Sequence, residues 1–409
     1  MKERLTQLRH WINRDEGMVF GITLFLHVVV VLIIYSGVLF PSPNDDTVYH
    51  GYGTQIASLL RSGHYVLGAV YPHHWYPLFV GSIYFFTGNV ILYGILFNAL
   101  LVALSAILLY KTIRYYRVSH RIALWTTLVV LNCYASLMYT TSLLLKEAWI
   151  IFLCITMLFI ATKIIAAQKF SWRMFIIFVI AFIFLRNLRH PIAFSAMSGF
   201  FVQWLLMKEG TWQYRVKYIL VMLGIVTVTT CLLMGDGILK NRSIIEYVSP
   251  QFVEQVRRGY RSGQTTGNLA VVIPQEVSMQ PQVLDTQAEE IISGLDEVNY
   301  GFSAHGTFVS IINSIFGPFP WQLSLQKYGI ALLDLGILYI GYILAVVVVR
   351  RGVYVGIPFF VIVAGLIASL SLGVDNIGAL LRYRIPLTIV VTIVAAIGIQ
   401  YRLDQKKIL

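Results

Sequence analysis

Charged residues and cysteines are both scarce in this chain. Of its 409 residues only 12% are charged, whereas 57% are apolar and the mean hydropathy is +0.73. Soluble domains rarely exceed about 50% apolar residues, so the composition argues against an ordinary soluble protein. The three cysteines, Cys133, Cys154 and Cys231, lie in apolar runs without CxxC or Cys/His spacing. We therefore expect them to be small buried hydrophobes rather than disulfide or zinc residues.

Nucleotide-binding motifs are also missing. The sequence contains no Walker motif and no GxGxxG pattern, which argues against transport driven by ATP bound to this chain. Internal repeats of the transporter kind are not visible either.

Long apolar runs recur along the chain and predict an all-α polytopic membrane protein with about ten transmembrane helices. The predicted spans are 18–40, 89–111, 122–142, 147–165, 172–187, 191–208, 217–235, 328–350, 354–372 and 384–402. The first run is too long for a typical signal-peptide core, and no small-x-small cleavage site follows it. We therefore expect an uncleaved first span.

Basic residues concentrate in short segments between these spans. They gather in 2–14, 111–121, 163–173, 208–217, 350–351 and 402–407. If the N-terminus is cytoplasmic, alternation of the spans brings every one of these segments to the cytoplasmic side, which is the positive-inside pattern. The formal net charge of +12 therefore indicates topology in the inner (cell) membrane and no nucleic-acid partner.

Two long segments remain on the predicted extracytoplasmic side. The first, 41–88, contains an apolar stretch, Trp75–Thr87, that is too short to cross a bilayer and predicts an interfacial or re-entrant helix. The second, 236–327, is polar and has a further interfacial candidate at 307–323. The chain then divides into a cytoplasmic N-terminus 1–17, helices one to seven over 18–235, the large loop 236–327, helices eight to ten over 328–402 and a cytoplasmic tail 403–409.

The first external loop opens with two adjacent acids, Asp45 and Asp46. One interpretation is that one of them caps a helix expected over Thr47–Leu60. The other is a carboxylate held at the lipid–water boundary as a general base, which would deprotonate an acceptor hydroxyl or amine.

The features that follow the acid pair resemble the membrane glycosyltransferases of the GT-C superfamily, such as protein O-mannosyltransferases and lipid A aminoarabinose transferases. They are Asp45-Asp46-Thr-Val-Tyr49, Gln55–Leu60, Ser62-Gly63, Trp75-Tyr76-Pro77-Leu78 and Thr87-Gly88, and the likeness is strongest over residues 18–165. The resemblance implies that Asp45 is the catalytic base and Asp46 its neighbour. Tyr49 then belongs to the substrate-binding surface.

Further candidates for substrate binding are Lys146, Glu147, His73 and His74. The resemblance implies that the acid at the external end of span four positions acceptor or donor. The alternative is a snorkelling lysine with Glu147 as its partner. Imidazoles suit carbohydrate or phosphate contacts, and the spacing of the histidines fits no metal-ligand pattern. We therefore expect neither a metal nor a cofactor.

Four arginines lie on the predicted external face: Arg186, Arg189, Arg382 and Arg384. Guanidinium groups at that depth need an anionic partner, and a lipid phosphate accepts the bidentate fork of arginine. The Arg-x-Arg sequence ahead of the last span also resembles the phosphate-binding arginine of many GT-C proteins. Interfacial anchoring, or an ion pair with Asp375, is the alternative.

The leading hypothesis is a membrane glycosyltransferase. Its donor would be a polyprenyl-phosphate-linked sugar, and its acceptor an extracytoplasmic glycan, lipid or protein. A polysaccharide polymerase or ligase acting on lipid-pyrophosphate-linked repeat units is an alternative in the same chemistry, with arginine and histidine in place of the acid pair. A flippase or other transporter for lipid-linked saccharides is an alternative of a different class, for which Asp334 is the main midplane candidate.

Overall fold

The computed structural model describes a large part of the chain. The described residues are 14–36, 44–63, 75–167, 172–205, 311–312, 315–316, 331–349, 362–363, 365–366 and 377–406. His73, His74, Asp375 and the predicted span 217–235 lie outside them, as do most of the predicted span 354–372 and nearly all of the loop 236–327.

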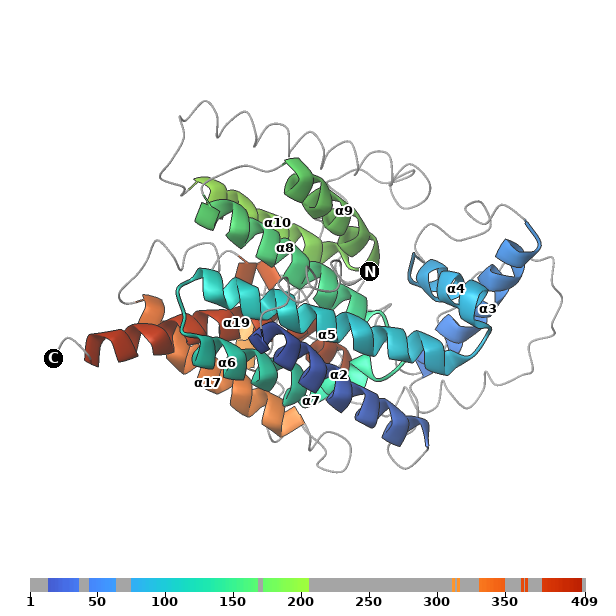
Figure 1. Ribbon diagram of the computed structural model, residues 1–409, viewed down its shortest axis with the longest axis horizontal. Helices are drawn as coiled ribbons and strands as arrows, with labels where there is room; N and C mark the ends of the chain where they lie inside the picture. Colours follow the sequence, from blue (N-terminus) through green and yellow to red (C-terminus); the bar gives the residue numbers. More distant parts are fainter. Residues whose placement is uncertain are drawn as a thin grey trace, which may run out of the picture.

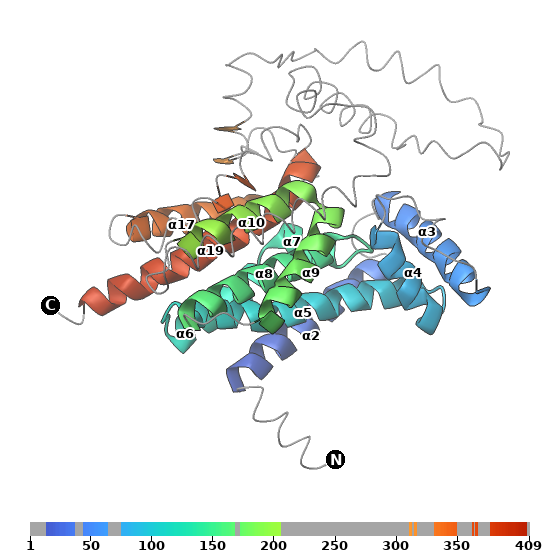
Figure 2. The ribbon, with the colours of Figure 1, turned by 90° about the horizontal axis from the view of Figure 1, so that it is seen from above.

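All regular structure in the described residues is helical (Figures 1 and 2). The helices are α2 (Arg14–Tyr35), α3 (Asn44–Arg61), α4 (Trp75–Thr87), α5 (Ile91–Tyr115), α6 (His120–Asn132), α7 (Ala135–Thr141), α8 (Glu147–Ala167), α9 (Trp172–Leu188), α10 (His190–Leu205), α17 (Ala331–Val349) and α19 (Ile377–Lys406).

Several of these helices are long and apolar enough to cross a membrane. In the described part of the chain the candidates are α2, α5, the Glu147–Ile164 part of α8 and the Arg382–Asp404 part of α19, and the bent pair α6 and α7 makes a fifth if it is one span. These helices fit a helical membrane protein. The total of about ten spans stays a prediction.

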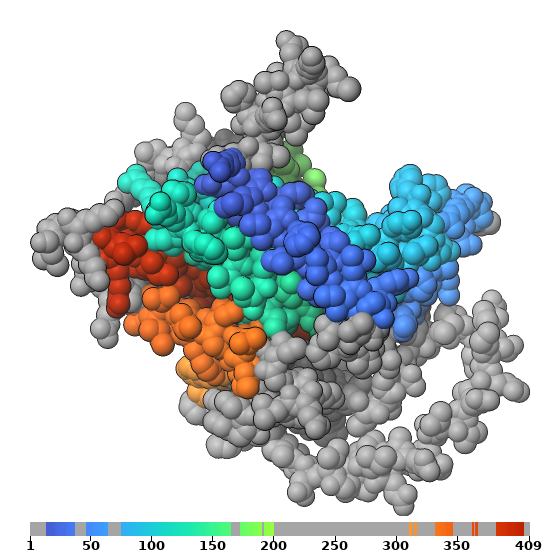
Figure 3. Space-filling view, turned by 60° about the horizontal axis from the view of Figure 1, so that its bottom comes forward, coloured from blue at the N-terminus to red at the C-terminus, as the bar shows by residue number. Residues whose placement is uncertain are grey.

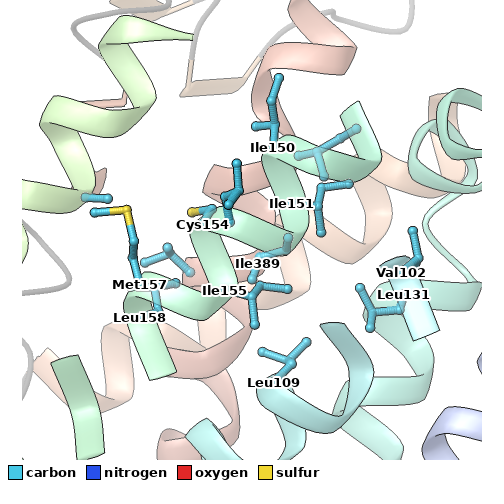
Figure 4. Packing of buried hydrophobic residues seen from close by; sticks show 14 of the residues in the cluster. Val102, Leu109, Leu131, Ile150, Ile151, Cys154, Ile155, Met157, Leu158 and Ile389 are labelled. Atoms are coloured by element: carbon cyan, nitrogen blue, oxygen red, sulfur yellow. The ribbon is translucent and has the colours of Figure 1, made fainter. Parts of the chain in front are cut away.

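The core forms where α8 packs against α5, α9 and α10, with α19 beside α6. Figure 4 shows Val102 and Leu109 of α5, Leu131 of α6 and Ile389 of α19 around a row of residues from Ile150 to Leu158 on α8. Cys154 is buried in this row as expected. Cys133, between α6 and α7, is exposed, so the expectation of a buried cysteine was wrong there.

Helix α2 lies on the outside of the bundle, across the face shown in Figure 3. Only 22% of its apolar window is buried, against 72% for α8. Large side chains such as Phe25 and Leu32 are exposed on it. An exposed apolar face of this length is typical of a helix that contacts lipid.

Helices α3 and α4 form a packed pair at one end of the molecule, away from the C-terminus (Figures 1 and 2). Their backbones come close because of two glycines. A Cβ on Gly53 would lie 2.4 Å from Val80, and one on Gly81 would lie 2.4 Å from Ile56. Stacking of Phe79 on Trp149, with ring centroids 4.0 Å apart, joins α4 to α8. The short helix expected over Trp75–Thr87 is confirmed.

The predicted span 122–142 is not one continuous helix. It is broken between α6 and α7, which are bent by 61° relative to each other. A break at membrane depth frees backbone groups, which must find partners inside the protein. Asn132, Cys133 and Tyr134 stand at this break, and none is a proline or glycine, so the sequence carries no sign of it.

Polar side chains from other helices bind the backbone freed by the break. His27 of α2 donates from Nε2 to the Leu131 carbonyl at 3.0 Å. The carboxylate of Asp334, on α17, accepts hydrogen bonds from the amides of Ala135 and Ser136 at the start of α7. These contacts make the bend a stable part of the fold.

The backbone of the turn after α7 is also bound by a polar side chain from another helix. Asn98 of α5 donates its amide to the carbonyls of Leu143 and Leu145, at 2.8 and 3.1 Å. Because the turn precedes α8 directly, Asn98 also sets where Lys146 and Glu147 stand.

Candidate functional site

Ionisable side chains from separate parts of the chain meet around the turn between α7 and α8. They come from the start of α3, the start of α8, the junction of α9 with α10, and the first half of α19. The sequence predicted all five as site residues, and the structure brings them into one electrostatic cluster: Asp46, Lys146, Glu147, Arg189 and Arg382. We call these five residues the charged cluster.

The centre of the cluster is a buried ion pair. Arg189 Nη2 lies 3.2 Å from Glu147 Oε1, with side chains 6% and 4% exposed. The guanidinium also lies over the ring of Tyr383, 3.6 Å from its centroid. Glu147 Oε2 and Arg189 Nε, by contrast, make no hydrogen bond to any described residue although both are buried. A buried pair with unused hydrogen-bonding groups is costly unless a ligand completes it.

Lys146 adds a second cation beside the pair. Burial lowers the pKa of its ammonium below the ordinary value, the neighbouring Arg189 and Arg382 lower it further, and Glu147 and Tyr383 act in the opposite direction. The cluster therefore holds more positive than negative charge around Lys146. Such an excess favours the binding of an anion.

Asp46 approaches the cluster from α3. Because α3 begins at Asn44, both acids of the pair lie in its first turn, and the expectation of a cap ahead of a helix at Thr47 was wrong. The side chain of Asp46 is 3% exposed, whereas that of Asp45 lies outside the described part. Asp46 and Arg382 both act electrostatically on Tyr139 of α7. A carboxylate in the first turn is also favoured by the helix dipole.

Tyr49 joins the same region through aromatic contacts. Its ring packs edge-on against Tyr76 of α4, with centroids 4.8 Å apart. Tyr76 is only 2% exposed. Burial raises the pKa of its phenol well above the ordinary value, and Glu147 is among the charges that act on it. Tyr49 thus contacts a ring on which the charge of Glu147 acts.

Arg382 and Arg384 lie in different surroundings. Arg382 lies just before the predicted last span and Arg384 is its first residue, whereas α19 begins earlier, at Ile377, and includes both. Arg382 is partly exposed. Arg384 is 1% exposed, and Asp334 and Tyr134 are among the charged and polar groups near it.

Arg186 lies three residues before Arg189 and is buried as well. Its side chain is 2% exposed, within the last turn of α9. Both arginines predicted at this end of α9 are therefore buried.

Three aromatic residues of the region were missed by sequence analysis: Tyr76, Tyr139 and Tyr383. Tyr383 stands between two predicted arginines, and its position was the available signal. Tyr76 lies in the aromatic segment that carries part of the resemblance, but it was given no role of its own. Nothing in the sequence singles out Tyr139, because its position near the charges depends on the bend before α7.

No protein-family model, curated protein or solved structure matches this chain. Within the described residues, no three His, Cys, Asp or Glu side chains are grouped so that they could hold a metal ion. Fold and composition together define the class as a helical membrane protein. The function must be argued from the charged cluster.

Proposed function

We propose that the chain is a membrane glycosyltransferase, which moves a sugar from a polyprenyl-phosphate donor to an extracytoplasmic acceptor. The acceptor is a glycan, lipid or protein of the cell envelope. Both termini are cytoplasmic in this proposal, and the charged cluster faces the opposite side. A donor activated by a lipid phosphate is needed there because nucleotide sugars stay in the cytoplasm.

The observation that carries the proposal is the incomplete ion pair in the charged cluster. Glu147 and Arg189 are buried, yet each keeps a hydrogen-bonding atom without a partner among the described residues. Lys146 and Arg382 supply additional positive charge beside them. A phosphate group would satisfy the guanidinium, and a sugar hydroxyl would satisfy the free carboxylate oxygen.

The transfer itself requires a base and a stabilised leaving group. The acceptor oxygen forms a bond to the anomeric carbon, while the bond from that carbon to the phosphate oxygen breaks. The acceptor proton passes to the carboxylate of Asp45, with Asp46 as its neighbour. Polyprenyl phosphate leaves, and Arg382 stabilises the charge that develops on it. Because attack occurs opposite the phosphate, the configuration inverts.

The two arginines of α19 have different roles in this mechanism. Arg382 is partly exposed and acts on Lys146, so it suits contact with the phosphate. Arg384 is fully buried near Asp334 and positions this part of α19.

The test is a transfer assay in proteoliposomes with a panel of polyprenyl-phosphate sugars. Asp45→Asn and Asp46→Asn keep the size of the side chain but remove the proton acceptor. We expect Asp45→Asn to lower the rate by about two to four orders of magnitude, and Asp46→Asn to have the smaller effect. Thermal stability should stay near that of the wild type in both. No transfer from any polyprenyl-phosphate sugar would contradict the proposal.

Asp45→Asn and two arginine variants separate the alternative functions. A polymerase or ligase would keep most of its activity in Asp45→Asn but lose it in Arg189→Gln or Arg382→Gln, and would use lipid-pyrophosphate-linked repeat units. A flippase would move labelled lipid-linked saccharide across the bilayer without forming a new glycosidic bond.

A further inference from the structure

A second polar site lies at the opposite end of the helices from α3 and α4. It is a cavity of about 360 Å³ between the start of α2, the end of α5 and the end of α8. Its polar lining includes three basic residues, Lys111, Arg114 and Lys163, and one acid, Glu16. In the predicted topology this end faces the cytoplasm.

The cations of this cavity are only partly neutralised. Lys111 Nζ pairs with Glu16 Oε2 at 2.9 Å. Arg114 donates from Nη1 to the carbonyl of Val118, and Lys163 lies 5.8 Å from the ring centroid of Phe159. Neither Arg114 nor Lys163 has a carboxylate partner among the described residues. The nearby Asp15 accepts a hydrogen bond from Tyr110.

The arrangement suits an anion with an apolar portion. Lys111 and Arg114 are three residues apart on α5 and so share one face of that helix. Lys163 comes from α8, which packs against α5. Phe159 and two tyrosines complete the wall, and aromatic side chains beside cations are typical of the membrane–water boundary. Its volume is near the lower end of the range of small-molecule sites, and the pocket is open to the outside.

We propose that this cavity binds a phosphate ester anion, held by Lys163, Arg114 and Lys111. The phosphate comes either from an anionic lipid headgroup in the adjacent leaflet or from a soluble phosphate compound. Glu16 opposes binding, because it neutralises Lys111 and repels the anion. The site does not depend on the glycosyltransferase proposal and shares no residue with the charged cluster.

The experiment uses the full-length protein, purified in a neutral detergent and titrated with phosphatidylglycerol while native mass spectrometry counts bound lipid. Phosphatidylcholine is the zwitterionic comparison, and inorganic phosphate and glycerol 3-phosphate are added in separate arms. Lys163→Gln and Arg114→Gln should each raise the dissociation constant for phosphatidylglycerol about fivefold. Arg173→Gln is the matched control, since Arg173 is exposed on α9 and does not line the cavity.

Glu16→Gln gives a result that misfolding cannot imitate, because it should tighten binding. If soluble phosphate displaces the lipid and binds alone, the occupant is soluble. If only phosphatidylglycerol binds, the occupant is a headgroup, and either result supports the site. An equal loss in Arg173→Gln would indicate diffuse attraction to the basic surface and overturn the proposal. Unchanged binding in both Lys163→Gln and Arg114→Gln would overturn it too.

Discussion

The ion pair between Glu147 and Arg189 should be strongly coupled, and a double-mutant cycle can measure the coupling. Glu147→Gln leaves a buried guanidinium without its charge partner, and Arg189→Gln leaves a buried carboxylate. Because both side chains are at most 6% exposed, each single change should lower the free energy of unfolding by about 3–5 kcal/mol. The double variant removes both charges, so its loss should be smaller than the sum by about 2–3 kcal/mol.

The assay is reversible denaturation in mixed micelles, followed by circular dichroism. The pair Lys111 and Glu16 is the internal control, because its side chains are 31% and 11% exposed although its atoms lie 2.9 Å apart. The same cycle there should give less than about 1 kcal/mol of coupling. If the effects of Glu147→Gln and Arg189→Gln add to within about 0.5 kcal/mol, burial does not strengthen this pair and our account of the cluster is refuted.

Other changes test separate parts of the structure. Because the pKa of Lys146 is lowered in the folded protein, the wild type should gain stability as the pH rises toward the unfolded lysine value, and a denaturation series should lack that gain in Lys146→Met. Arg382→Lys should reduce donor use about tenfold in the transfer assay at unchanged thermal stability, whereas Arg384→Lys should lower the melting temperature. Asp334→Asn should cost about 1–3 kcal/mol of unfolding free energy and speed hydrogen exchange at the start of α7. Gly81→Ala, which forces a Cβ to within 2.4 Å of Ile56, should cost about 1–3 kcal/mol in the same denaturation assay.

Local signals in the sequence were enough for much of the helical plan. The bounds of α4 and the start of α8 follow from hydropathy and length, because Trp75–Thr87 is too short to span and Glu147 begins a new apolar run. The break before α7 could not be predicted, because the side chains that bind its freed backbone, His27 and Asp334, come from distant parts of the chain. Long-range partners of this kind leave no trace in a local apolar pattern.

The charged cluster was predictable as a set of residues but not as an arrangement. Each member stood out because ionisable groups are rare in such an apolar chain. The packing of α9 and α19 decides that Glu147 pairs with Arg189. It also decides that Arg384 is the buried arginine of α19. Of the three tyrosines near the charges, only Tyr383 had a signal in the sequence, its position between two arginines.

The contact between Asp334 and the start of α7 has a consequence for the order of assembly. The Ala135 amide and the carboxylate that accepts its hydrogen bond are 199 residues apart. At usual rates of synthesis, roughly 10–40 s separate the emergence of the two groups from the ribosome. During that time α7 lacks the acceptor that holds its first turn. The bend is therefore completed late, after α17 has been synthesised, and a chain that stops before α17 retains an unfinished helix end at the start of α7.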